Sequence, residues 1–308
     1  IMFKTYSMEL AGRPLTIETG KFAGLANADV VVRYGETVVM VNVTASKEPR
    51  DGIDFFQLSV DYEEKMYAVG KIPGGFNKRE GKASEHAILT SRVIDRPMRP
   101  LFPKDYRNDV TLNNMVMSVD PQCNPEVVAM LGSSIATCIS DIPFDGPCAA
   151  TQVGMIDGEL IINPTLEQNA KSDLKLTVAS TREKVIMIEA GANEVPEAKM
   201  IEAIFEADKV NKEIIAFIDK IVADCGKAKH SYESCAVPEE LFAAMKEIVT
   251  PEEMEVAVFS DDKQTREENI RQVTAKLEEA FADNEEWLAV LGEAVYQYQK
   301  KTVRKMIL

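Results

Sequence analysis

Short segments in which apolar and polar residues alternate fill the first part of the chain and predict β-strands. Two of these segments are rich in valine and are joined by Tyr34-Gly35-Glu36, which is typical of a hairpin. Strands are expected at residues 5–9, 15–18, 29–33, 37–43, 56–62 and 110–119.

Two helices are predicted among these strands. The first begins at Ser84 and is expected to end at Arg96, because the proline that follows disfavours helical geometry in the preceding residue. The second follows Asn124-Pro125, an N-cap residue with proline in the first helical position. Residues 126–140 are rich in alanine, glycine and serine, so this helix can approach a sheet closely.

The next stretch again places strands before helices. A hairpin over residues 151–162 turns at Asp157-Gly158, and a second strand pair is expected at 174–180 and 184–189. Two amphipathic helices are then expected, one at residues 196–207 and one at 211–224. Strands followed by helices predict an α+β layering.

The last part of the chain loses its β-branched runs, and glutamate, lysine and alanine dominate it. Residues 226–237 are polar and predict a linker, and helix starts are expected at Pro238, Thr250, Asp261 and Asp283. We therefore predict an α+β core in two parts, residues 1–146 and 147–237, followed by an all-helical domain at residues 238–308.

Composition narrows the class of protein. Five scattered cysteines without a C-x-x-C pair predict reduced thiols, and two isolated histidines argue against a His/Cys metal site. No apolar run reaches the roughly 18 residues that a membrane span needs, and the start of the chain lacks the apolar segment of a signal peptide. A cytoplasmic protein that does not enter a membrane is expected.

Charge is unevenly distributed along the chain. The whole chain carries a formal charge of −15, whereas residues 65–107 hold ten basic and four acidic residues, a local balance of +6. This positive island is what a localised polyanion site requires, and a salt-bridged subunit contact is the alternative.

The island contains the glycine-rich segment from Gly70 to Glu85. Its glycine spacing is wrong for a phosphate-binding P-loop, and Lys82 is followed by alanine where a hydroxyl is needed, so that function is excluded. Phe76 offers a face on which a base can stack, and the two cations after Asn77 can meet phosphates. The segment is thus either an RNA clamp or a flexible basic loop.

Four motifs carry a resemblance to a known family: K-I-P-G-G-F-N-K-R-E-G, R-V-I-D-R-P-M-R-P-L-F, D-P-Q-C-N-P-E-V-V-A-M-L-G-S-S and D-I-P-F-D-G-P. In this order they resemble the first ribonuclease PH-type core of the bacterial polynucleotide phosphorylases, and the resemblance covers essentially the whole chain. It implies a ribonuclease PH-like core with a ribosomal-protein-like two-layer β/α fold, followed by the all-helical domain. It also implies messenger-RNA degradation from the 3′ end with inorganic phosphate, in a ring-shaped homotrimer through which single-stranded RNA threads.

The resemblance also implies site residues. The loop Phe76-Asn77-Lys78-Arg79 corresponds to the narrow neck of the family's pore, where two aromatics usually precede two arginines. Asn77 replaces the second aromatic and Lys78 the first arginine, so the loop is expected to grip RNA with less stacking. The arginines implied in RNA or phosphate handling, or in shaping the trimer, are Arg92, Arg96 and Arg99.

Catalysis is expected outside this chain. In the family a second core carries paired aspartates that hold Mg²⁺ or Mn²⁺ and a turn that binds phosphate. The matching strand here has Asp173 in the first acidic position and Lys175 in the second, which makes a poor metal site. The family's second core and its additional RNA-binding modules are not found in the sequence, so the chain resembles an N-terminal fragment that is inactive by itself.

Two other functions remain as alternatives. The first alternative is a scaffold that binds RNA incidentally. The second is a self-sufficient small ribonuclease PH-like enzyme, which Lys175 and the helical region both argue against. Degradosome proteins are possible partners that the family suggests.

Overall fold

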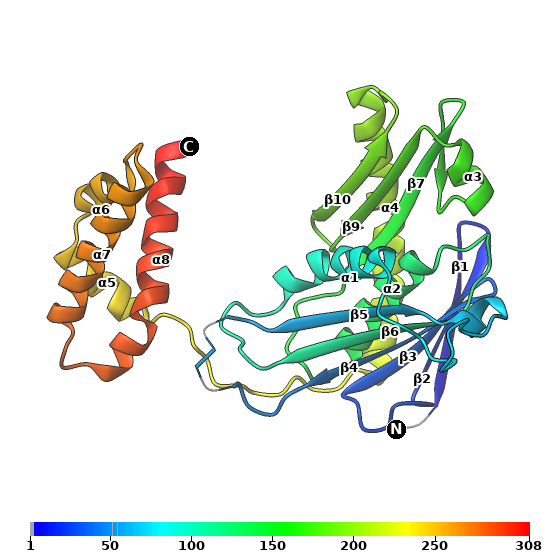
Figure 1. Cartoon of the computed structure of the whole chain (residues 1–308), viewed down its shortest axis with the longest axis horizontal. Helices are drawn as coiled ribbons and strands as arrows, with labels where there is room; N and C mark the ends of the chain where they lie inside the picture. Colours follow the sequence, from blue (N-terminus) through cyan, green and yellow to red (C-terminus); the bar gives the residue numbers. More distant parts are fainter. Residues whose placement is uncertain (1–2, 51, 54) are drawn as a thin grey trace. The chain divides into compact units, whose positions relative to one another are not determined.

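The protein divides between Tyr232 and Glu233 into two compact units, as seen in a computed structural model that describes residues 3–50, 52–53 and 55–308. All of the described strands lie in unit 1, whereas unit 2 is built from helices (Figure 1). The predicted α+β class is confirmed.

A six-stranded sheet forms the larger layer of unit 1, in the order β1-β2-β3-β4-β6-β5. Neighbouring strands are antiparallel except β5, which runs parallel to β6. Val30 pairs with Val41 and Val32 with Val39, and all four side chains are fully buried. The strands are β1 (Lys4–Leu10), β2 (Arg13–Thr19), β3 (Ala28–Tyr34), β4 (Thr37–Ala45), β5 (Leu58–Glu64) and β6 (Val110–Ser118).

Helix α2 (Pro125–Ile139) packs on this sheet. It begins as predicted, with the Asn124 side chain accepting a hydrogen bond from the amide of Glu126. A Cβ atom added at Gly132 would lie 2.6 Å from Val41 Cγ2 and 3.1 Å from Val32 Cγ2. The absence of a side chain at this position therefore sets how closely helix and sheet approach each other.

A second sheet has the order β10-β9-β7-β8 and is antiparallel throughout. Its strands are β7 (Ala149–Ile156), β8 (Glu159–Ile162), β9 (Leu174–Ser180) and β10 (Val185–Ala192). The predicted turn at Asp157-Gly158 joins β7 to β8, and both residues have positive φ angles, 51° and 82°. The short helix α3 (Leu166–Lys171) follows β8, and α4 (Glu197–Cys225) packs on β7 and β9.

Two helix predictions were wrong. Instead of separate helices at 196–207 and 211–224, α4 is continuous through Asn211. The buried Asn211 side chain donates through Nδ2 to the carbonyl of Val178 and to Ser180 Oγ, so β9 engages the donor group of a side chain that would otherwise favour a break.

Helix α1 (Glu85–Met98) likewise continues through Pro97 instead of ending at Arg96. Its last turn buries Pro97 and Met98 against the core, and the short helix η2 (Arg99–Leu101) follows directly. The start of α1 is as predicted, with Ser84 as its N-cap.

The segment after α4 has no helix or strand, yet its first residues are fixed to unit 1. The amide of Lys227 donates to the carbonyl of Ile139, and that of His230 donates to the carbonyl of Asp141. The Lys229 ammonium donates to the carbonyls of Thr137, Cys138 and Ser140, at distances of 3.1, 2.9 and 2.7 Å. Residues 226–232 are therefore a docked strap along the end of α2.

Unit 2 contains α5 (Glu239–Ile248), α6 (Pro251–Val258), α7 (Lys263–Ala280) and α8 (Glu285–Ile307). Each begins within two residues of a predicted start. Trp287 packs edge-on against Phe281, with ring centroids 5.1 Å apart, in the core of this unit. Across the described part of the chain, no helix combines the length and apolar character that crossing a bilayer requires.

Candidate functional site

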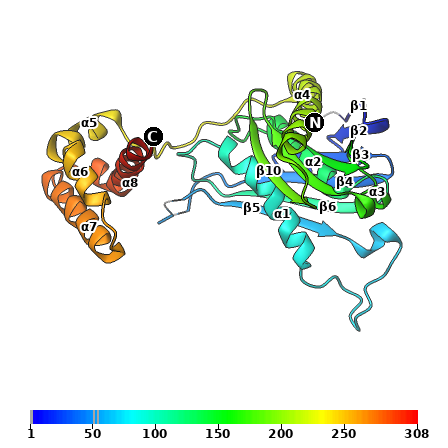
Figure 2. The same cartoon turned by 90° about the horizontal axis from the view of Figure 1, so that it is seen from above.

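The glycine-rich segment forms an exposed loop between β5 and α1. The short helix η1 (Met66–Val69) follows β5 and ends at Gly70, whose φ angle of 69° is left-handed. Residues 71–84 then run without helix or strand, and Figure 2 shows this cyan segment projecting from unit 1. We call residues 71–84 the basic loop.

The tip of the basic loop presents one aromatic ring and two cations. The amide of Lys78 donates to the carbonyl of Gly75, with N···O 3.0 Å, which closes a turn around Phe76 and Asn77. Phe76 is 102% exposed, and the other three tip residues, Asn77 to Arg79, are exposed as well. The ring is therefore open to a stacking partner.

A hollow of about 470 Å³ lies between the basic loop, the end of β5 and the start of α1. Arg79 and Lys82 line it from the loop, and Lys65 lines it from the opposite wall. A hydrogen bond with Glu63 raises the pKa of Lys65, so its ammonium is firmly charged at neutral pH.

The three candidate arginines differ in what they contact. Arg92 is exposed on α1, and Arg96 on the same helix pairs with Glu189 of β10 at 3.2 Å. Arg99 donates to both carboxylate oxygens of Asp95, and also to the carbonyls of Phe56 and Leu58. Arg99 thus holds the entry to β5 against α1, whereas Arg92 and Arg96 lie on the exposed part of the helix.

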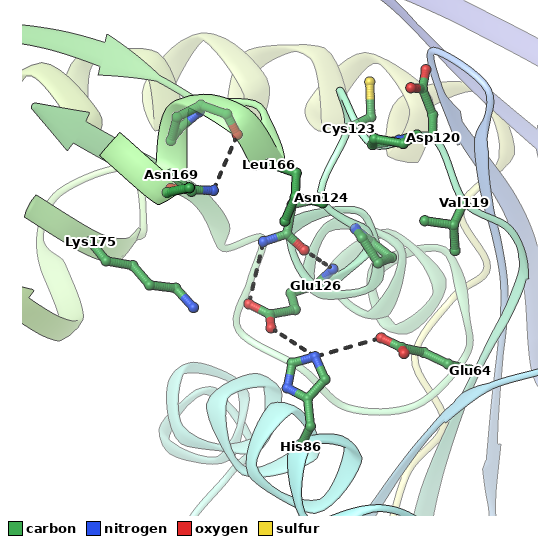
Figure 3. A pocket seen from close by; sticks show the side chains of 14 residues that line it. Glu64, His86, Val119, Asp120, Cys123, Asn124, Glu126, Leu166, Asn169 and Lys175 are labelled. Atoms are coloured by element: carbon green, nitrogen blue, oxygen red, sulfur yellow. Dashed lines mark hydrogen bonds and ion pairs between the residues drawn. The ribbon is translucent and has the colours of Figure 1, made fainter. Parts of the chain in front are cut away.

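A second pocket, of about 490 Å³, lies where α1, α2, α3 and β9 converge (Figure 3). His86, in the first turn of α1, points between two carboxylates, with Nε2 3.4 Å from Glu126 Oε1 and 3.6 Å from Glu64 Oε1. Glu126 also accepts from Gln152 Nε2, and Glu64 accepts from the Tyr62 hydroxyl, whose pKa is raised by burial.

Lys175 extends from β9 into this pocket, whereas Asp173 is not among its lining residues (Figure 3). The Asp173 carboxylate accepts instead from Asn193 Nδ2 at 3.3 Å. Among the residues that the structure describes, no group of three or more His, Cys, Asp or Glu side chains is arranged to hold a metal. An ammonium group in the pocket does not fit a divalent cation.

Cys123 also lines the pocket, and burial raises the pKa of its thiol. A thiol that stays protonated at neutral pH is a weak nucleophile, so covalent chemistry at this cysteine is disfavoured.

The sequence did not reveal the partners of His86. The sequence shows only that the two histidines are isolated from each other and from cysteine pairs, whereas the fold brings His86 to Glu64 at the end of β5 and to Glu126 at the start of α2. The only available signal was the predicted N-terminus of α2, where an acidic residue is common.

Two sequence profiles of one protein family match this chain. The profile of domain 1 of the 3′ exoribonuclease family matches residues 11–143, and that of domain 2 of the same family matches residues 146–210. Together these cover most of unit 1 and more than half of the chain. The chain belongs to the 3′ exoribonuclease family.

Individual relatives within this family show which proteins the chain is similar to. The chain is 71% identical over 308 residues to the polyribonucleotide nucleotidyltransferase of Lachnoclostridium phytofermentans. The match includes 100% of this chain and 44% of that protein. The chain is 56% identical, with the same coverage, to the enzyme of that name from Ruminiclostridium cellulolyticum. A third relative of that name, from Clostridioides difficile, is 53% identical over 270 residues, or 88% of this chain and 38% of the relative.

The chain therefore spans less than half the length of these enzymes. They confirm the predicted resemblance to polynucleotide phosphorylases. Among solved structures, rice (Oryza sativa) Rrp46 matches with a TM-score of 0.56 at 12% identity, covering 71% of this chain and 94% of that one. At this identity the match supports the ribonuclease PH-like fold alone.

Proposed function

We propose that this chain is the RNA-gripping, non-catalytic part of a 3′-to-5′ phosphorolytic exoribonuclease that works in the cytoplasm as a homotrimer. The observation that carries the proposal is the fully exposed Phe76 ring on a turn that also presents Lys78 and Arg79. A ring that stacks on any base, beside cations that meet phosphates, binds single-stranded RNA without reading its sequence.

Arg92 is exposed on α1 and can meet a phosphate of the RNA, and Arg96 can do so through the guanidinium nitrogens that its pair with Glu189 leaves available. Arg99 contributes indirectly, because its guanidinium is occupied by Asp95 and by two backbone carbonyls. Its role in the proposal is to hold β5 and α1, the two elements from which the basic loop departs.

Bond cleavage in this proposal belongs to the rest of the protein, which would also hold the divalent metal and the phosphate. The support is Lys175, whose ammonium lines the pocket in place of a second acid. The purified chain, given RNA, phosphate and Mg²⁺ or Mn²⁺, is expected to release no nucleoside diphosphate. Release at a rate proportional to chain concentration would contradict the proposal.

The grip is tested by the affinity of the chain for a fluorescently labelled single-stranded RNA. We expect Phe76→Ala combined with Lys78→Ala and Arg79→Ala to weaken binding by at least about 5- to 150-fold, the value of one lost base stack. Loss of two phosphate contacts should also reduce the slope of log K against log salt by about 1.4.

The matched control replaces an exposed aromatic and two exposed lysines of α4, Phe205, Lys209 and Lys220, by alanine. It removes the same number of rings and charges elsewhere on unit 1. Equal loss of affinity in both triple variants would reduce the effect to net charge, and no loss in the loop variant would favour the scaffold function instead.

A further inference from the structure

The basic loop has one fixed point between its ends. The amide of Met66 donates to Glu80 Oε1, with N···O 3.0 Å. Among the described residues, this is the one hydrogen bond that joins residues 72–83 to the rest of unit 1, since the other bond in this stretch, from Lys78 to Gly75, stays within the loop.

The bond satisfies a donor that would otherwise lack a partner. Met66 is the first residue of η1, and the N-cap residue Lys65 offers no side-chain acceptor to the start of this helix. A carboxylate acceptor makes a shorter and stronger hydrogen bond than a neutral one. Glu80 supplies this acceptor, and both Glu80 and Met66 line the hollow beside the loop.

Glu80 directly follows Arg79, so a fixed Glu80 restricts where the tip of the loop can lie. The flanking glycines give no such restriction, because a Cβ added at Gly74, Gly75 or Gly81 would contact nothing within 4 Å. Without the bond the loop would sample many conformations, and binding RNA would carry the entropic cost of ordering it.

The charge of Glu80 acts in the opposite direction. A carboxylate beside Arg79 and near Lys65 lowers the positive potential that attracts RNA phosphates. If charge alone mattered, any neutral residue at this position would strengthen RNA binding.

We propose that Glu80 is a positioning residue that pre-orders the basic loop for RNA through its hydrogen bond to the Met66 amide. This inference rests on the proposed RNA grip of the loop. It predicts that the hydrogen bond affects RNA affinity more than the negative charge does. Variants at this position should therefore bind RNA tightly only if they retain the acceptor.

Three substitutions separate the two effects. Glu80→Gln keeps an acceptor at the same reach and removes the charge, Glu80→Ala removes both, and Glu80→Asp keeps the charge but is one methylene shorter. We expect Glu80→Gln to bind labelled single-stranded RNA at least as tightly as the wild type. Glu80→Ala should bind about two- to tenfold more weakly, the effect of one net hydrogen bond, and Glu80→Asp should bind weakest.

Hydrogen exchange provides the readout of position. The Met66 amide should exchange faster in the Ala and Asp variants and remain protected in the Gln variant, with unchanged thermal unfolding because Glu80 is exposed. If Glu80→Ala binds RNA as tightly as Glu80→Gln, or more tightly, the positioning role is refuted. If the Phe76, Lys78 and Arg79 triple variant binds like the wild type, the RNA grip itself fails, and this inference fails with it.

Discussion

Lys229 of the docked strap closes the C-terminal end of α2, and its replacement by methionine tests whether the strap stabilises unit 1. The last carbonyls of a helix have no partner within the helix. The Lys229 ammonium donates hydrogen bonds to the carbonyls of Thr137 and Cys138, and also to the carbonyl of Ser140. Lys229→Met keeps the apolar stem of the side chain but removes the charge and all three hydrogen bonds.

The expected loss is about 2 kcal/mol of unfolding free energy. A hydrogen bond to a charged group contributes about 1.5–3 kcal/mol, and a partly buried cation at a helix C-terminus contributes up to about 2 kcal/mol. The three bonds share one ammonium, so their values do not add. Burial lowers the pKa of Lys229, which means that desolvation offsets part of the gain.

Calorimetry measures the change in the unfolding midpoint, and hydrogen exchange in the intact protein measures the protection of the amides of α2. For a unit of this size, a loss of about 2 kcal/mol lowers the unfolding midpoint by roughly 4–8 °C. Amides at the end of α2 should exchange faster, and limited proteolysis should begin within the strap. The control is Lys209→Met on the exposed face of α4, expected within about 0.5 kcal/mol of the wild type. An unchanged midpoint with unchanged exchange in Lys229→Met would refute the reasoning.

Three further predictions concern the loop, the helix–sheet contact and the thiols. Asn77→Phe should tighten single-stranded RNA binding by up to the value of one base stack, about 1–3 kcal/mol, whereas Asn77→Leu should not; equal affinities in a fluorescence titration would contradict this. Gly132→Ala should lower the unfolding midpoint of unit 1, because overpacking against Val41 costs about 1–3 kcal/mol and exceeds the roughly 1 kcal/mol gain in helix propensity. As the control, Gly292→Ala in α8, where the added Cβ meets nothing within 4 Å, should stabilise unit 2 by up to about 1 kcal/mol; calorimetry that showed the same direction of change in both variants would contradict the packing argument. Burial raises the pKa of Cys138 to about 12 and that of Cys148 to about 11, so iodoacetamide at pH 8 should label them only after unfolding, later than the less buried Cys225 and Cys235.

Local patterns explain what the sequence could predict. The valine strands, the Asn124 cap and the Asp157-Gly158 turn depend on residues close together in the chain, and all are observed. The exposed loop around Phe76 was likewise recognisable from its glycines and cations.

Tertiary contacts explain what the sequence could not predict. α4 remains continuous where β9 accepts hydrogen bonds from Asn211 Nδ2. His86 lies beside two acids because the end of β5 and the first turns of α1 and α2 meet at one place. The strap looked like a free linker because Lys229 is held by backbone carbonyls at the end of α2, which carry no sequence signal. The Glu80 contact with the Met66 amide is of the same kind.

The parallel pairing of β5 with β6 has a consequence for how such a surface can change. Two parallel neighbours cannot be joined by a tight turn, so the polypeptide must travel back along the sheet before β6 begins. That return path contains residues 65–107 with their local charge of +6, while the register of β6, at its far end, is also set by β4. Insertions or exchanges at the exposed tip of the basic loop would therefore alter affinity for a polyanion and leave the hydrogen-bonding pattern of the sheet intact.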